Sequence, residues 1–330
     1  QIKVNFTAQC GHNCSRPCYL EEGSFVCPAA CSRGLPCGHP CPHQCGQPCA
    51  QECQVCVEEL QQRREQEEAL LEEQLKKLIK KAKKKKFSLY PCTWSESSSD
   101  MHRADVTGEL RELMQHLLDG TCNTSALGTG KDQKQPGAYS GLEMVKVEQI
   151  ENRTLFLQYR SRYLQLLKDK PEAKSHTELD SKGVATGQSL KRSSLAAQLD
   201  PNVRECYLFH GTKAETAEAI IATGFEERLA KLNGLYGAGN YFADKSSKSD
   251  QYTVSNSGGV HFMFVARVML GAHVFDTKKT CNEKRILDLI PGTHVRYSAL
   301  LGLSGHHREF VVYDGHQAYP EYLVHYRHTK

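Results

Sequence analysis

Two short stretches of the sequence carry side chains suited to binding a flat, polar ligand. The first, YLFHGT at 207–212, places His210 and Gly211 after an apolar run, and the second, YFADKSSKSDQY at 241–252, begins and ends with tyrosine. A histidine can act as a base or as a hydrogen-bond donor, and a glycine lets another group approach its backbone closely. Tyrosine rings offer flat faces for stacking. Together these residue types are suited to holding a planar heterocycle.

A carboxylate far downstream would turn this binding set into a catalytic one. Glu309 lies in HREFVVYD, just before a valine-rich run. Taken singly, each residue has an ordinary interpretation: His210 as a core histidine, Tyr241 as part of a sheet core, and Glu309 as the edge residue of a strand. Only their combination, in this order along the chain, indicates chemistry.

The elements around these residues predict a mixed α+β domain with a mostly antiparallel sheet. From 203 onward, short apolar runs alternate with glycine-rich turns, and these runs have the composition of strands: ECYLFH, GNYFA, HFMFVARVML, EFVVYD and YLVHYRH. The stretch AETAEAIIATG has the spacing of a helix closed by Gly224.

The chain before residue 203 is less uniform. ELRELMQHLLDG at 109–120 has helical spacing and a glycine stop at Gly120. The segment 142–168 has the pattern of a strand that runs into an amphipathic helix. SESSSD and GTGKDQKQPGAYSG have the composition of loops, and 170–195 is polar enough to be predicted as a loop as well.

This domain resembles the catalytic domain of the poly(ADP-ribose) polymerase family, within the diphtheria-toxin-like ADP-ribosyltransferases. Three motifs in the family's order carry the resemblance: YLFHGT, GLYGAGNYFADKSSKSDQY and REFVVYDGHQAYPEYLVHY. It covers about residues 88–330, is densest over 142–168 and 203–330, and in QAYPEYL is similar to the tankyrases and the macrodomain-bearing members. It implies a mostly antiparallel split β-sheet with flanking helices.

The resemblance also implies a site. The family's catalytic histidine, tyrosine and glutamate match His210, Tyr241 and Glu309. It implies that His210 holds the adenine-side ribose of NAD, that Gly211 and Ser249 bind the nicotinamide amide, and that the two tyrosines enclose the ring. Arg228 is expected to meet the pyrophosphate. The residues implied to bind NAD are His210, Gly211, Thr212, Arg228, Tyr241, Ser249 and Tyr252.

The function that follows is NAD-dependent transfer of ADP-ribose to a protein, including the chain itself, or to a nucleic-acid end, with release of nicotinamide. Loss of nicotinamide leaves an oxocarbenium-like ribose, which the Glu309 carboxylate would stabilise before orienting the attacking hydroxyl. A glutamate here permits chain elongation in the family, so both poly and mono transfer stay open. The alternative is a zinc-finger module that binds nucleic acid or protein and carries a catalytically silent NAD-binding domain.

Some expectations concern the surroundings of the site. Residues 225–240 should form the short loop that covers the donor, and Tyr297 and His307 should line the acceptor groove. The stretch 142–202 is too short for the helical regulatory subdomain of family members that act on damaged DNA. The cysteine-bearing zinc site of tankyrases has no counterpart in QYTVSNSGGVHFMFV, so the catalytic domain is expected to be metal-free.

The N-terminal region, residues 1–57, has the composition of a small metal-binding head. Of fifteen cysteines, eleven lie between Cys10 and Cys56, and the motif Cys-Gly-His-x-Cys-x-x-x-Cys occurs twice, beginning at Cys10 and at Cys37. Apolar residues are too few for a hydrophobic core, and metal binding can supply the missing folding energy. A disulfide mesh is the alternative, which the repeated histidine disfavours.

Thirteen residues are candidate metal ligands, enough for about three tetrahedral zinc ions at four ligands each. The pattern resembles zinc fingers of the nuclear X-box-binding factor type, which implies nucleic-acid or protein partners. The second copy fits along its length, whereas YLEEGSFV interrupts the first. The candidates are Cys10, His12, Cys14, Cys18, Cys27, Cys31, Cys37, His39, Cys41, Cys45, Cys49, Cys53 and Cys56.

Residues 58–87 are predicted to form a charged helical linker to the catalytic domain at 88–330. Seven glutamates in 58–73 precede eight lysines in 76–86, an order that suits the helix dipole. The cluster Lys80–Lys86 is either a solvated helix end, a contact to nucleic acid, or a nuclear-entry signal.

Composition adds little about partners and location. The 330 residues carry a net charge of +4, too weak to indicate nucleic acid by itself. No apolar run has the length of a membrane span, so no membrane partner is expected. The clustering of cysteines outside the large domain favours the nucleus or cytoplasm. The first residue is Gln, and a longer natural chain is expected.

Overall fold

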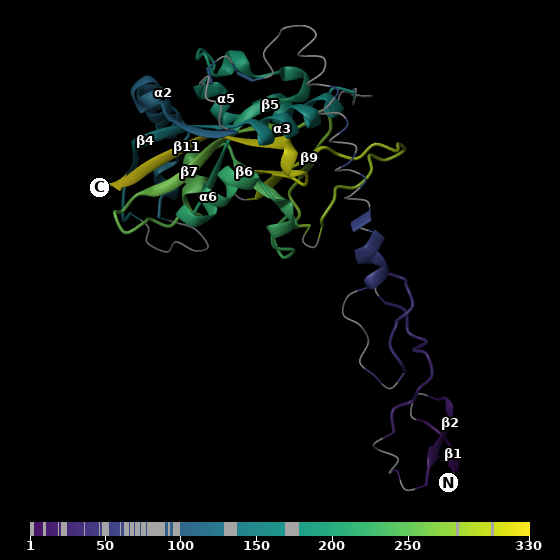
Figure 1. Cartoon of the computed structure of the whole chain (residues 1–330). Helices are drawn as coiled ribbons and strands as arrows, with labels where there is room; N and C mark the ends of the chain where they lie inside the picture. The colour runs from purple at the N-terminus through teal and green to yellow at the C-terminus, as the bar shows by residue number, and fades with distance from the viewer. Residues whose placement is uncertain are drawn as a thin grey trace. The chain divides into compact units, whose positions relative to one another are not determined.

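The computed structural model divides the chain into two compact units, Gln1–Gln74 and Leu75–Lys330 (Figure 1). The division falls inside the predicted linker, and the domain boundaries given above stay predictions. The structure describes residues 3–8, 11–18, 20, 25–35, 37–45, 47, 53–59, 61–62, 66, 69, 73, 77, 90–91, 93–94, 100–128, 137–168, 178–281, 284–304 and 307–330.

A nine-stranded sheet forms the centre of the second unit. Its strand order is β3-β4-β11-β7-β5-β6-β10-β9-β8. Neighbours are antiparallel except β8 and β9, which are parallel. The fold class predicted from sequence is therefore confirmed. The strands are β3 (Met101–Asp105), β4 (Gly141–Asn152), β5 (Glu205–Thr212), β6 (Asn240–Ala243), β7 (His261–Met269), β8 (Val274–Thr277), β9 (Ala299–Ser304), β10 (His307–Val312) and β11 (Ala318–Thr329).

The sheet is split between β5 and β6. These two strands share a single register pair, Phe209 with Ala243, whereas β5 pairs with β7 along its whole length to Thr212. Beyond Phe209 the end of β5 therefore has a strand on one side only. On the far side of β6, Glu309 in β10 pairs with the same Ala243.

Both faces of the sheet are covered, and strand β7 is buried on both of them. Successive side chains of a strand point to opposite faces, and every residue of β7 is buried. Phe264 packs in a cluster with helix α6, and Met263 packs in a cluster with helix α2. In Figure 1, α2 and α6 accordingly lie on opposite faces of the sheet.

The helices follow the sequence prediction in the long cases. Residue 120 ends α2, and Gly224, at φ 84°, caps α6. Asn152 begins α3 by accepting a hydrogen bond from the Leu155 backbone amide at 3.1 Å. The α-helices of this unit are α2 (Thr107–Gly120), α3 (Arg153–Leu166), α4 (Glu178–Lys182), α5 (Ala185–Ser189), α6 (Ala214–Thr223) and α7 (Ser246–Asp250).

The prediction of a loop over 170–195 is wrong in part, because α4 and α5 lie within it. The segment has too few apolar residues to show a helical period, but its few buried side chains dock on the sheet. Thr186 is fully buried and donates its hydroxyl to the Tyr207 carbonyl, and Leu190 joins the α2 cluster. Strands β3, β8 and β9 were also not predicted, since each is short and interrupted by charged residues or glycine.

Short 3-10 turns connect several of these elements. They are η2 (Thr124–Ala126), η3 (Ala196–Gln198), η4 (Pro201–Val203), η5 (Glu227–Leu229) and η6 (Gly315–Gln317). Among the described residues, no helix combines the length and apolar character needed to span a membrane.

Apart from the helical residues that begin at 54 and run into the linker, the described residues of the first unit contain little regular structure. Strands β1 (Lys3–Thr7) and β2 (Asn13–Pro17) form an antiparallel pair. Isolated bridges join Ala30 to Gln44 and Gly34 to Pro40. The described residues of the predicted linker up to residue 77 are helical, whereas Lys80–Lys86 lies outside the described residues.

Candidate active site

His210 bridges the two halves of the split sheet. Its Nδ1 lies 2.8 Å from the Tyr241 carbonyl oxygen, so a hydrogen bond joins β5 to β6. Because a carbonyl oxygen only accepts, Nδ1 carries the proton in the neutral ring and Nε2 is left as an acceptor. Burial lowers the pKa of His210, which favours this neutral form. A hydroxyl group is the partner that such a nitrogen suits.

Gly211 allows α7 to approach β5 closely. A Cβ atom at this position would lie 1.9 Å from the Ser249 carbonyl oxygen and 3.0 Å from the Thr253 side chain. Any larger residue would therefore push α7 away from the strand. Ser249 and Thr212 are both buried beside this contact. The structure thus brings together Gly211 and Ser249, two residues predicted to share a ligand.

Tyr241 ties the loop 225–240, which is predicted to cover the donor, to the sheet. Its hydroxyl accepts a hydrogen bond from the Tyr236 backbone amide and donates one to the Gly237 carbonyl, each at 2.8 Å. Burial, together with the charge of Glu309, raises the pKa of Tyr241 and keeps the phenol protonated. In the same loop, the Arg228 guanidinium pairs with Glu226 at 2.6 Å and is half-exposed.

Glu309 is buried with half of its hydrogen-bonding capacity unused. Its side chain lies next to β6, and only 6% of the residue is exposed. Oε1 lies 2.9 Å from Lys248 Nζ and 3.5 Å from the Tyr252 hydroxyl. Oε2 is buried and has no hydrogen-bond partner among the described residues. Tyr252 itself is 51% exposed and so presents a free aromatic face.

Lys248 is a residue of this site that sequence reasoning missed. It donates a hydrogen bond to the Tyr252 hydroxyl at 3.0 Å, and its Nζ lies 5.0 Å from the centre of that ring. Burial alone would lower the pKa of Lys248, but the charge of Glu309 and the hydrogen bonds to Tyr252 and Glu309 together outweigh burial and raise the pKa. The spacing of Lys248 and Tyr252 could have indicated this contact, since residues four apart on a helical turn lie on one face.

The two residues predicted to line an acceptor groove lie on elements close to the site residues: His307 is two residues before Glu309 in β10, and Tyr297 packs on the same apolar cluster as Tyr241. His307 begins β10, and Tyr297 packs against Phe275 with ring centres 5.2 Å apart. Their role in acceptor binding stays a prediction.

A second polar cluster is centred on Asp250, the last residue of α7. Asp250 accepts hydrogen bonds from the Tyr326 hydroxyl at 2.6 Å, from His328 Nε2 at 2.8 Å, and from Tyr139. The His261 and His328 rings stack 3.9 Å apart. Metal coordination is a poor fit, because nearly parallel stacked rings do not aim their lone pairs at one point. The donors to Asp250 instead make a hydrogen-bonded support for α7.

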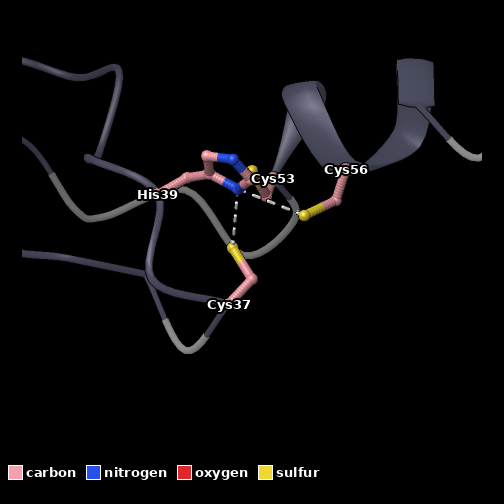
Figure 2. Close-up of side chains that lie close together, drawn as sticks. All are labelled: Cys37, His39, Cys53 and Cys56. Carbon is pink, nitrogen blue, oxygen red and sulfur yellow. Dashed lines mark hydrogen bonds between the residues drawn. The ribbon is translucent and has the colours of Figure 1, made fainter.

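Among its described residues, the N-terminal unit contains two clusters of metal-ligand type. Figure 2 shows the first, in which the side chains of Cys37, His39, Cys53 and Cys56 converge. The second contains His12, Cys27 and Cys45. Within each cluster the ligand atoms lie within 4.8 Å of one another. No disulfide joins any two of the described cysteines of this unit.

The remaining ligand candidates divide into two groups. Cys14, Cys18, Cys31 and Cys41 are described but belong to neither cluster, and Cys10 and Cys49 lie outside the described residues. In the first cluster, hydrogen bonds from the His39 backbone and ring lower the pKa of the Cys37 thiol to about 6. The hydrogen bond between Cys56 and Cys37 in turn raises the pKa of the Cys56 thiol to about 12.

Comparison with known proteins bears on the second unit. The family model described as the poly(ADP-ribose) polymerase catalytic domain matches residues 128–328. The mouse (Mus musculus) protein mono-ADP-ribosyltransferase PARP12 is 35% identical over 125 residues, which cover 38% of this chain and 17% of the relative. Human (Homo sapiens) protein mono-ADP-ribosyltransferase PARP11 is 29% identical over 145 residues, 38% of this chain and 42% of the relative.

A more extended match is to a probable poly [ADP-ribose] polymerase of Dictyostelium discoideum. It is 24% identical over 238 residues, which cover 71% of this chain and 59% of the relative. The chain therefore spans less than two thirds of each of these relatives. The family model does not extend over the head, so the likeness to X-box-type zinc fingers stays a prediction.

Proposed function

The chain belongs to the poly(ADP-ribose) polymerase catalytic domain family, and on that premise we propose that it is an NAD-dependent ADP-ribosyltransferase. One observation carries the proposal. Glu309 Oε2 is a buried carboxylate oxygen with no partner among the described residues, beside the place where β5 and β6 part. Burying such an atom costs stability, and a substrate hydroxyl would complete its hydrogen bonding.

The described contacts support a pose for NAD. Neutral His210 offers Nε2 as an acceptor to a ribose hydroxyl, because Nδ1 is engaged with Tyr241. The backbone of Gly211, at the end of β5 where one side has no strand, is available to the nicotinamide amide. The exposed ring of Tyr252 can stack on the nicotinamide. The roles of Ser249, Thr212 and Arg228 toward the donor are part of the same proposal.

The chemistry follows from the charge of Glu309. As the bond to nicotinamide breaks, positive charge develops on the ribose. A preformed, buried carboxylate stabilises that charge more than it stabilises bound NAD. Lys248, 2.9 Å from Oε1, fixes the orientation of the carboxylate. The same carboxylate can then take the proton of the attacking hydroxyl.

Chain growth is a separate part of the proposal. Glu309 supports elongation, because an incoming ribose hydroxyl needs a base as much as a protein side chain does. The names of PARP12 and PARP11 instead describe transfer of single units by those proteins. The two products are distinguishable on a gel, since elongation gives a ladder and single transfer gives one band.

Self-modification with labelled NAD tests the enzyme proposal. The wild-type chain should become labelled, and Glu309→Gln should lose most of the label. Glu218→Gln is a matched control, since Glu218 is an exposed glutamate on α6 that pairs with Arg103. NAD binding without labelling of the wild type would favour the rival function, a silent NAD-binding scaffold.

For the N-terminal unit we propose zinc binding. The two clusters of cysteine and histidine offer the ligands that zinc prefers, and the unit has few apolar residues to fold around. Chelation should unfold this unit and leave the catalytic unit folded. Protein or nucleic acid stays the proposed partner of the head.

A further inference from the structure

The path of the backbone through the head brings residues of its two sequence copies together. The Cys31 amide donates to the His43 carbonyl at 3.1 Å, and the Cys45 amide donates to the Ala29 carbonyl at 2.8 Å. The chain therefore folds back on itself between 29 and 45. This return places Cys45, from the second copy, beside Cys27, from the first.

The first cluster has donor distances suited to one zinc ion. His39 Nδ1 lies 3.6 Å from Cys37 Sγ and 3.3 Å from Cys56 Sγ, as the dashed lines in Figure 2 mark. Tetrahedral zinc, with bonds of about 2.3 Å to sulfur and about 2.05 Å to nitrogen, places sulfur and nitrogen about 3.6 Å apart. Cys53 supplies the third thiolate. All four ligands come from the second copy.

The second cluster contains three ligands, and Cys14, the candidate for a fourth, lies next to one of them, Cys27. Cys14 Sγ lies 3.5 Å from Cys27 Sγ. Two thiolates on one tetrahedral zinc lie about 3.8 Å apart, whereas a disulfide would require about 2.05 Å. With Cys14, the cluster becomes three cysteines and one histidine, the same donor set as the first.

Two further cysteines have a different environment. Cys31 and Cys41 are buried in a small apolar cluster with Leu35, in the segment that links the two ligand sets. A buried thiol behaves as a small apolar residue. These two side chains therefore contribute to the core of the fold-back.

We propose that the head binds zinc at an intertwined pair of sites, one formed by Cys37, His39, Cys53 and Cys56 and the other by His12, Cys14, Cys27 and Cys45. This partition rests on the zinc binding proposed above and goes beyond it. Cys45 of the second copy completes the site of the first copy. The two copies are then one folding unit, not two independent fingers.

The test uses the full chain, purified under reducing conditions and carrying Cys45→Ser. Native mass spectrometry counts zinc, and alkylation with peptide mapping reports which thiols have lost their metal. We expect the loss of one zinc ion, with new labelling at Cys14 and Cys27 and continued protection of Cys37, Cys53 and Cys56. Cys18→Ser is the control, because Cys18 is exposed and outside both clusters; it should keep the wild-type zinc content.

Other results overturn the partition. Retention of all zinc in Cys45→Ser would show that Cys45 is not a zinc ligand, and new labelling at Cys37, Cys53 or Cys56 would show that it serves the other site. The reciprocal variant Cys56→Ser should expose Cys37 and Cys53 and leave Cys27 and Cys45 protected.

A second measurement needs no variant and covers the case in which a variant misfolds. The wild-type chain is depleted stepwise with a chelator and alkylated at each step. Thiols should become reactive as the set Cys14, Cys27, Cys45 or as the set Cys37, Cys53, Cys56. Sets that mix these residues contradict the partition. A wild-type chain without zinc contradicts zinc binding itself, so the two failures are distinguishable.

Discussion

Glu321 and Glu309 are both buried carboxylates of the catalytic unit that face a cation, and they differ in how fully they are hydrogen-bonded. Glu321 accepts from Arg267 Nε at 2.6 Å and Nη2 at 2.8 Å, and from the Tyr207 hydroxyl at 3.0 Å. Glu309 meets Lys248 through Oε1 alone, and its Oε2 is buried without a partner among the described residues.

This difference in hydrogen bonding distinguishes a carboxylate that stabilises the fold, Glu321, from one that can act on a ligand, Glu309. A guanidinium binds both carboxylate oxygens in a fixed fork, whereas an ammonium is a point charge that engages one. The Arg267 pair is therefore closed, with each carboxylate oxygen bonded and little left for a ligand. The Lys248 pair is open, and the fold tolerates an incompletely bonded atom there. Such a departure from full hydrogen bonding leaves the Glu309 carboxylate available for chemistry.

Removing the closed carboxylate should have the largest effect, and on stability. Glu321→Ala leaves the Arg267 guanidinium buried without its main partner, which should lower the free energy of unfolding by about 3–5 kcal/mol. Urea denaturation of the variant measures this loss. Glu309→Ala is the matched comparison, and an equal loss of stability there would erase the distinction between the two pairs.

Removing the charge of the open carboxylate should act on rate. Glu309→Gln keeps the shape of the side chain, so we expect NAD affinity within about threefold and a transfer rate lower by roughly 10²–10³-fold. Titration calorimetry and single-turnover transfer separate the two quantities. Elongation should suffer more than first attachment, since it also needs the base. Chain growth at the wild-type rate would remove Glu309 from the mechanism.

Asp250 is a third buried carboxylate, and both of its oxygens accept hydrogen bonds, as those of Glu321 do. The stability of this hydrogen-bonded cluster can be tested by changing the pH. Burial lowers the pKa of its neighbour His261 to about 4. A histidine whose folded pKa is lowered stabilises the fold fully above its unfolded value near 6.5, and this stability is lost as the pH falls toward 4. The loss should reach about 3 kcal/mol, at about 1.4 kcal/mol per pKa unit.

Thermal or urea denaturation between pH 7 and pH 4 measures this dependence, and His261→Gln should flatten it. Asp250 contributes separately at lower pH. Burial alone would raise its pKa, but hydrogen bonds, first from His328, outweigh burial and lower it. An unchanged pH profile in His261→Gln would assign the loss to other groups.

The smallest expected effect comes from converting the open pair into a closed one. Lys248→Arg supplies a second donor, which can engage Glu309 Oε2. We expect slightly higher stability and a transfer rate lower by about tenfold, the equivalent of one hydrogen bond. Lys245→Arg, three residues earlier, is the control. A variant that gains stability without losing rate would show that Oε2 is not the reactive atom.

Sequence reasoning reached the strands and the residues that carry a local signal. His210 and Gly211 lie near the end of the apolar strand β5, and Glu309 directly precedes the apolar residues of β10, so strand pattern and motif agree there. The registers of Phe209 with Ala243 and Ala243 with Glu309 then bring the two ends into line across β6. Their catalytic roles stay predictions.

What sequence reasoning missed depends on contacts between distant segments. The Arg267–Glu321 pair joins residues 54 apart, and nothing local distinguishes that glutamate from a surface one. α4 and α5 have little intrinsic helical signal and form because a few side chains dock on the sheet. The placement of Cys45 beside Cys27 likewise follows from the fold-back of the chain, which the spacing of the copies does not reveal.

The single register pair between β5 and β6 also bears on how the protein opens. Proteins unfold locally along lines where few hydrogen bonds must break, and this seam is such a line. His210 and Gly211 lie on one side of it, and Tyr241 and Glu309 lie on the other. A ligand that contacts both sides binds only when β5 and β6 are together, so its binding raises the free energy needed to separate the two strands. Occupancy of the site would then be readable as slowed amide exchange along β5 and β6, with the bound molecule serving as the missing connection between two half-sheets.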